Sequence, residues 1–122
     1  MSTVLVIDDD PQIRSWLRDL LDAEGHHVVE AEDGNEGLAC FHRSHPDLVV
    51  LDIYMPNKDG LETILLLRNT DPAVKILAIS GGVIKGYDVY KPAKAFGAHV
   101  ALVKPFDAKE FLAHVERLLN TL

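Results

Sequence analysis

Five short apolar segments rich in β-branched residues recur along the chain, and each is too short to form a helix of ordinary length. They are Val4–Ile7, Val28–Val29, Leu48–Leu51, Ile76–Ile79 and His99–Val103. Segments of helical periodicity separate them. This strict alternation is typical of a parallel β-sheet that helices cover on both faces. The chain has 122 residues, which suits one open α/β sandwich, because an eight-fold barrel needs about twice that length.

The segments between the predicted strands carry start and stop signals of helices. Asp10 can cap a helix that begins at Pro11 and stops at Gly25. The other predicted helices open at Asp33 or Asn35 and run through 41, cover 61–69, and cover 107–120. Glycine and proline residues interrupt the segment after the fourth strand, at Gly81, Gly82, Gly86 and Pro92. They predict a glycine loop followed by a short helix around residues 89–96.

The charge of the chain argues against direct nucleic-acid binding. Twelve Lys and Arg residues stand against nineteen Asp and Glu residues, the net charge is −7, and no basic run offers a stripe for a phosphate backbone.

The sequence has no positively charged leader and no run of about eighteen apolar residues, so it predicts neither a signal peptide nor a membrane span. We therefore expect a cytoplasmic protein. The single cysteine, Cys40, cannot pair within the chain.

Polar residues stand directly after four of the five predicted strands. Three consecutive aspartates follow the first strand, and an aspartate, a serine and a lysine follow the third, fourth and fifth. These residues are Asp8, Asp9, Asp10, Asp52, Ser80 and Lys104. Ligands of open α/β sheets bind at the carboxyl ends of the strands. We therefore expect these side chains to meet at one edge of the sheet.

Crowded carboxylates at such an edge point to a divalent cation. Carboxylates within about 4–6 Å of one another raise each other's pKa, and Mg²⁺ relieves this repulsion and keeps sites for water and phosphate oxygens. Asp52 could then attack phosphorus, since carboxylates form aspartyl phosphates, and Lys104 and Ser80 suit the oxygens of a transferred phosphoryl group. Each residue also has a structural explanation as a helix cap, a turn residue or a surface side chain. Their common place at the strand ends favours phosphoryl chemistry.

Five motifs together resemble the receiver domain of two-component response regulators, from Val4 to about Leu118. They are Val-Leu-Val-Ile-Asp-Asp-Asp at 4–10, Ala-Glu-Asp-Gly-Asn-Glu-Gly-Leu at 31–38, Pro-Asp-Leu-Val-Val-Leu-Asp-Ile-Tyr-Met-Pro-Asn-Lys-Asp-Gly at 46–60, Ile-Ser-Gly at 79–81, and Gly-Ala leading to Val-Lys-Pro-Phe at 97–106. The resemblance implies a flavodoxin-like (βα)5 fold with strand order 2-1-3-4-5 and one receiver domain over residues 1–122. A chain of this length resembles a single-domain response regulator, without its own output domain.

The resemblance also implies a metal site. Asp9 and Asp52 resemble side-chain ligands of Mg²⁺, or of Mn²⁺ in its place. Asp8 would act on the metal through water, and Tyr54 would lend its backbone carbonyl. Asp52 resembles the phosphoacceptor, and Gly60 would open the loop that follows it.

The remaining site residues resemble the switch of the family. Ser80 is similar to a hydroxyl that turns toward the phosphoryl group, and Lys104 to a lysine that pairs first with Asp52 and then with a phosphate oxygen. The Lys104–Pro105 bond is similar to one that is cis in the family. The implied donor is a sensor histidine kinase or a histidine phosphotransfer protein. The implied output is a changed surface formed by the fourth predicted helix, around residues 89–96, and the fifth predicted strand, His99–Val103. This surface would control an unidentified protein partner, so the chain would not be an enzyme in the usual sense.

The chain departs from the family pattern at three places. Ala101 stands where family members usually carry Tyr or Phe, so the usual aromatic switch is absent. The extra length between Ser80 and Lys104 falls in the glycine-rich segment, and we hypothesise that residues 81–96 carry the signal. Tyr54 is bulky and lies beside the expected path of the hydrolytic water, which predicts slow self-dephosphorylation.

Two other interpretations use the same residues. A phosphatase of the haloacid-dehalogenase type also has an aspartyl nucleophile and Mg²⁺, and its Asp-x-Asp motif is contained in Asp8-Asp9-Asp10, but the chain is short for that family and lacks a cap insertion. A phosphorylation-independent interaction module on the same fold would have lost an acidic or lysine position. None of these positions is lost here.

Overall fold

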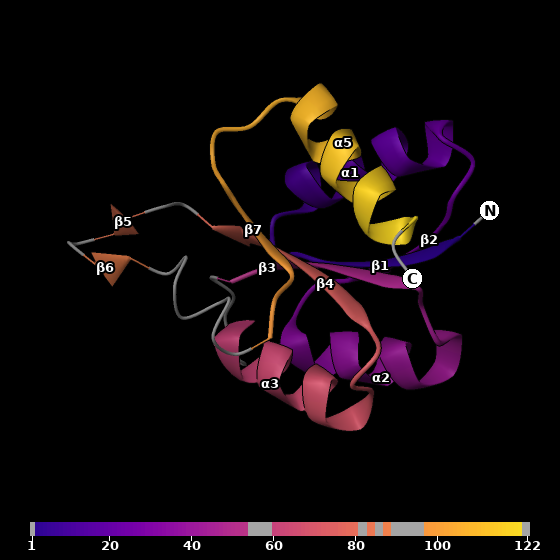
Figure 1. The fold of residues 1–122 in the computed structure, drawn as a ribbon, viewed down its shortest axis with the longest axis vertical. Helices are drawn as coiled ribbons and strands as arrows, with labels where there is room; N and C mark the ends of the chain where they lie inside the picture. Colours follow the sequence, from indigo (N-terminus) through magenta and orange to yellow (C-terminus); the bar gives the residue numbers. More distant parts are fainter. Residues whose placement is uncertain (1, 54–59, 81–82, 85–86, 89–96, 121–122) are drawn as a thin grey trace.

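A five-stranded parallel sheet with helices on both faces forms the centre of the structure, a computed structural model that describes residues 2–53, 60–80, 83–84, 87–88 and 97–120 (Figure 1). Its strands are β1 (Thr3–Ile7), β2 (His27–Ala31), β3 (Leu48–Asp52), β4 (Lys75–Ser80) and β7 (Val100–Val103). They lie in the order β2-β1-β3-β4-β7. Counted within the sheet this is the order 2-1-3-4-5, so the flavodoxin-like prediction is confirmed.

Aspartate caps begin three of the helices. The helices are α1 (Pro11–Ala23), α2 (Gly34–Ser44), α3 (Gly60–Thr70) and α5 (Ala108–Leu119). The side chains of Asp10, Asp33 and Asp107 accept hydrogen bonds from backbone amides in the first turns of α1, α2 and α5, an interaction that typically stabilises a helix by about 1 kcal/mol. Asp33 rather than Asn35 therefore opens α2. In the described part of the chain, no helix has the length and apolar character that crossing a bilayer requires.

The strands are apolar throughout because both faces of the sheet are covered. Successive side chains of a strand point to opposite faces. In β1, Val4 and Val6 pack with residues of α1 and α5, whereas Leu5 and Ile7 pack with residues of α2 and α3. Figure 1 shows the same two layers, with α1 and α5 on one side of the sheet and α2 and α3 on the other. This burial on both faces explains the continuous apolar runs in the sequence.

The segment after β4 differs from its prediction. Val83–Ile84 (β5) and Tyr87–Asp88 (β6) pair as an antiparallel two-stranded sheet, which Figure 1 shows beyond the end of β4. The sequence predicts only a glycine loop here, because strands of two residues are too short to show alternation. The short helix predicted around 89–96 and the signalling role hypothesised for 81–96 fall largely outside the described residues.

Candidate functional site

The carboxyl ends of β1 and β3 bring three aspartates together. Asp8 and Asp9 follow β1, and Asp52 is the last residue of the neighbouring strand β3. One carboxylate oxygen from each residue lies within 4.8 Å of the other two. Asp8 and Asp52 are buried, whereas Asp9 is exposed. The structure thus places the three carboxylates at one edge of the sheet, as the strand ends predict, and leaves the cluster accessible beside Asp9.

One buried oxygen of Asp8 is available to a ligand. Oδ1 accepts a hydrogen bond of 2.9 Å from the backbone amide of Asp10, but Oδ2 has no hydrogen-bond partner among the residues that the structure describes. Burial is the main cause that raises the pKa of Asp8 from its usual 3.8 to about 6; the Asp10 amide opposes this shift, and the Asp52 carboxylate adds to it. A divalent cation would provide Oδ2 with a partner, through a bound water, and offset the repulsion between the carboxylates. The three carboxylates therefore fit Mg²⁺ or Mn²⁺.

Lys104 joins this edge from the end of β7. Its Nζ lies 3.6 Å from Oδ2 of Asp52, and its backbone amide donates a hydrogen bond of 2.7 Å to the carbonyl of Ser80. Ser80 is the last residue of β4 and is completely buried. Asp52 is paired with Ile79 in the sheet, so Ser80 lies one residue beyond the position that faces Asp52. The Lys104–Pro105 peptide bond is cis, as the resemblance implies.

The structure does not describe every predicted site residue. Tyr54, for which the sequence implies a metal-binding carbonyl and slow self-dephosphorylation, lies outside the described residues. Its two roles stay predictions.

Gly60 packs against the backbone of Ile53, the residue that follows Asp52. The amide of Gly60, the first residue of α3, donates a hydrogen bond of 3.0 Å to the carbonyl of Ile53. A Cβ atom at Gly60 would lie 2.4 Å from both the Cα and the carbonyl oxygen of Ile53. Backbone atoms cannot turn aside as a side chain can, so only glycine allows this approach.

We expect Gly60→Ala to lower the free energy of unfolding by roughly 1–3 kcal/mol, because the added methyl group must push the Ile53 backbone away. Urea denaturation measures this change. The direction of the change in the free energy of unfolding is informative, since alanine in place of a helical glycine ordinarily stabilises a protein by up to about 1 kcal/mol. Equal or higher stability of the variant would show that Ile53 yields without cost.

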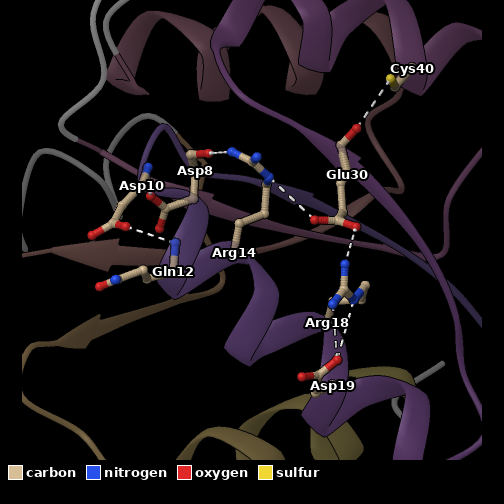
Figure 2. Close-up of polar contacts among 8 residues, drawn as sticks. All are labelled: Asp8, Asp10, Gln12, Arg14, Arg18, Asp19, Glu30 and Cys40. Atoms are coloured by element: carbon tan, nitrogen blue, oxygen red, sulfur yellow. Dashed lines mark hydrogen bonds and ion pairs between the residues drawn. The ribbon is translucent and has the colours of Figure 1, made fainter.

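The site also contains a residue that the sequence analysis missed. Arg14 of α1 donates a hydrogen bond of 2.7 Å from Nη1 to the carbonyl of Asp8 and one of 3.3 Å from Nε to Oε1 of Glu30 (Figure 2). The sequence contained one indication of its role. A positive side chain near the N-terminus of a helix opposes the helix dipole, so Arg14 is expected to pair with an acceptor elsewhere in the fold.

Comparison with known families agrees with this geometry. The sequence matches the response regulator receiver domain over residues 4–116. This chain belongs to that family. Receiver domains are signalling modules rather than classical enzymes; they take a phosphoryl group from histidine kinases and in general bind Mg²⁺.

The relatives found by sequence comparison are about twice as long as this chain. The transcriptional regulatory protein CpxR of Klebsiella pneumoniae is 35% identical over 98% of the chain and 50% of CpxR. The probable transcriptional regulator ycf27 of Porphyridium aerugineum is 38% identical over 96% of the chain and 48% of ycf27. The chain therefore spans about half the length of these relatives.

Solved receiver structures have the same fold. The chemotaxis protein CheY4 of Vibrio cholerae superposes with a TM-score of 0.87 at 30% identity, over 97% of this chain and 98% of CheY4. The receiver domain of NtrX from Brucella abortus superposes with a TM-score of 0.89 at 30% identity, over 98% of this chain and 99% of that domain. The sequence match places the chain in the receiver-domain family, and the structural comparison shows that it has the receiver fold.

Proposed function

We propose that this receiver domain accepts a phosphoryl group on Asp52, in a Mg²⁺-dependent reaction, from the phosphohistidine of a sensor histidine kinase or a histidine phosphotransfer protein. One observation carries the proposal. Asp52 lies both in the three-carboxylate cluster, within 4.8 Å of the Asp8 and Asp9 oxygens, and 3.6 Å from the ammonium group of Lys104. A nucleophilic carboxylate between a metal site and a cation is suited to in-line phosphoryl transfer.

The transfer exchanges one bond to phosphorus for another. A carboxylate oxygen of Asp52 attacks the phosphorus atom, and the bond to the histidine nitrogen of the donor breaks with its electron pair left on that nitrogen. Bound Mg²⁺ supplies positive charge for the phosphoryl oxygens. We assign Asp9 and Asp52 as its side-chain ligands, Asp8 as a ligand through water and Tyr54 as a carbonyl ligand. Lys104 and the Ser80 hydroxyl hold the remaining phosphoryl oxygens.

The output of the reaction is a change of surface. Phosphorylation replaces the single negative charge of the Asp52 carboxylate with a phosphoryl group that carries nearly two, and it places three strong acceptor oxygens next to Lys104 and Ser80. The hydrogen bond between the Lys104 amide and the Ser80 carbonyl already joins the ends of β7 and β4, so a movement of either residue reaches both strands. We propose that the rearranged face formed by β7 and the short helix predicted around residues 89–96 binds or releases a protein partner. Because histidine kinases use ATP, we place this reaction in the cytoplasm.

The direct test is phosphorylation by a small donor. The protein is incubated with acetyl phosphate and Mg²⁺, and its intact mass is measured. We expect one added phosphoryl group, located on the peptide that contains Asp52, and none when a chelator removes the metal. An unchanged mass would favour a phosphorylation-independent interaction module. Steady release of phosphate from p-nitrophenyl phosphate would favour a phosphatase of the haloacid-dehalogenase type.

We expect Lys104→Met to slow phosphorylation of Asp52 by acetyl phosphate on the order of a hundredfold, because the variant loses a positive charge aimed at the transferred group. Intact-mass measurement of samples quenched at successive times gives the rate. Lys109→Met is the matched control, since Lys109 is an exposed residue of α5, and it should react at the parental rate. Equal rates for both variants would remove Lys104 from the reaction.

A further inference from the structure

The backbone of the acidic turn is held from three sides at Asp8. The Asp8 amide donates a hydrogen bond of 3.1 Å to the carbonyl of Ala31 in β2. The Asp8 carboxylate accepts one of 2.9 Å from the Asp10 amide. The Asp8 carbonyl accepts one of 2.7 Å from Nη1 of Arg14. Of these three partners of Asp8, Arg14 is the one that contributes a side chain, and it fixes the peptide that joins Asp8 to Asp9.

Arg14 is itself held in place by an ion pair with Glu30, which Figure 2 shows. Its Nε lies 3.3 Å from Oε1 of Glu30, on β2. The other oxygen of Glu30 lies 3.2 Å from Nη1 of Arg18, one turn further along α1. The side chain of Arg14 is 19% exposed and that of Glu30 is 29% exposed. The planar guanidinium group thus connects two fixed acceptors, an arrangement that orients it firmly.

The charge of Arg14 does not explain its place. A positive group beside a cation site repels the cation, so by charge alone Arg14 would weaken Mg²⁺ binding. The carboxylate of Glu30 offsets that charge, and the hydrogen bond to the Asp8 carbonyl remains. What Arg14 contributes at the turn is therefore geometry.

We infer that Arg14 is a positioning residue for the metal site, with Glu30 as its support. By fixing the Asp8–Asp9 peptide, Arg14 sets the directions in which the carboxylates of Asp8 and Asp9 leave the chain toward Asp52. This inference rests on the proposed function, because it concerns the affinity of the same site for Mg²⁺. Groups that orient metal ligands from behind commonly change metal affinity by about 10- to 100-fold.

The test is calorimetric titration of Mg²⁺ into the unphosphorylated protein. We expect Arg14→Met to weaken Mg²⁺ binding about tenfold. The direction of the change in Mg²⁺ affinity separates a positioning role from a charge effect, because loss of a nearby positive charge by itself would tighten binding. The phosphorylation rate of the variant should fall at low Mg²⁺ and recover most of the loss at saturating Mg²⁺, since Asp52 and Lys104 are unchanged. Amide NMR should show the largest shifts at Asp9 and Asp10.

Arg18→Met is the matched control. Arg18 lies on the same helix and contacts the same Glu30, but the bonds that the structure gives its side chain go to Glu30 and Asp19 and not to the acidic turn. We expect its Mg²⁺ affinity to stay within about twofold of the parent. Arg14→Lys retains the charge but lacks the fork that connects two acceptors, so we expect it to bind Mg²⁺ less tightly than the parent by about fivefold. It carries the test alone if circular dichroism shows Arg14→Met to be unfolded.

The outcomes separate the inference from the proposed function. If the parent binds Mg²⁺ and both Arg14 variants bind it equally well, Arg14 has no positioning role and the proposed function stands. If Arg18→Met weakens binding as much as Arg14→Met, the effect belongs to the packing of α1 on β2 and the inference is wrong. If the parent binds no Mg²⁺, the proposed function fails and the inference fails with it.

Discussion

The Asp52→Asn variant is expected to gain no phosphoryl group under conditions that fully phosphorylate the parent protein. An amide is a poor nucleophile, and neither neighbouring carboxylate can replace Asp52. Asp8 is buried with a pKa raised to about 6, and the ion pair of Lys104 in the described structure is with Asp52. Intact-mass measurement after incubation with acetyl phosphate and Mg²⁺ checks this prediction.

The control for this loss is an aspartate away from the cluster. Asp22 is exposed on α1, and Asp22→Asn should be phosphorylated as completely as the parent. The Asp52→Asn protein should remain folded, because asparagine has nearly the same shape and its introduction removes one of three crowded negative charges. A phosphoryl group found on Asp8 or Asp9 of the variant would show that the identity of the nucleophile is not set by the geometry around Lys104.

Asp8→Asn is expected to make the metal-free protein more stable near neutral pH while weakening its binding of Mg²⁺. The folded-state pKa of Asp8 is raised to about 6 from 3.8, so the fold favours the protonated carboxyl group. The stability that this preference contributes is present at low pH and is lost as the pH rises from about 4 through 6. Above that range the ionised carboxylate costs at most about 3 kcal/mol for a shift of about two pKa units. Allowing for solvent at this open edge, we expect a gain of roughly 1–2 kcal/mol in the uncharged variant.

Urea denaturation at two pH values measures the effect. With a chelator present at pH about 7.5, the Asp8→Asn variant should be more stable than the parent, and near pH 4 the difference should disappear. Added Mg²⁺ should reduce or reverse the difference, because a ligand stabilises only the protein that binds it. Asp10→Asn is the control, since asparagine also caps helices and the Asp10 side chain accepts its bond from Gln12. Lower stability of Asp8→Asn at neutral pH would show that the charged form of Asp8 is well accommodated.

Most of the fold could be predicted because its signals are local. The Asp10 cap, the apolar strands and the aspartates after β1 and β3 are all readable from short stretches of sequence, and the structure has them at those places. Ends of elements moved by only one to a few residues; the last sheet strand, for instance, begins at Val100 rather than His99. Strand order is not a local property, and its prediction came from the resemblance to receiver domains.

The parts that could not be predicted depend on residues far apart in the chain. The β5–β6 pair gives no signal because its strands are too short for alternation. The link from Arg14 to Glu30 spans sixteen residues and forms only when α1 packs beside β2. The clash that requires glycine at position 60 comes from the backbone at Ile53, which a pattern of side chains does not reveal.

By itself the sequence determined the class of the fold and the chemical groups at its functional edge, because periodicity and residue type are set locally and parallel strands bring their carboxyl ends together. The tertiary structure alone decided how those groups differ. It buries Asp8 and leaves Asp9 exposed, pairs Lys104 with Asp52, and places Arg14 behind the acidic turn. Burial and distance depend on how the whole chain packs, and they decide the pKa of a carboxyl group and the direction in which it faces a metal ion.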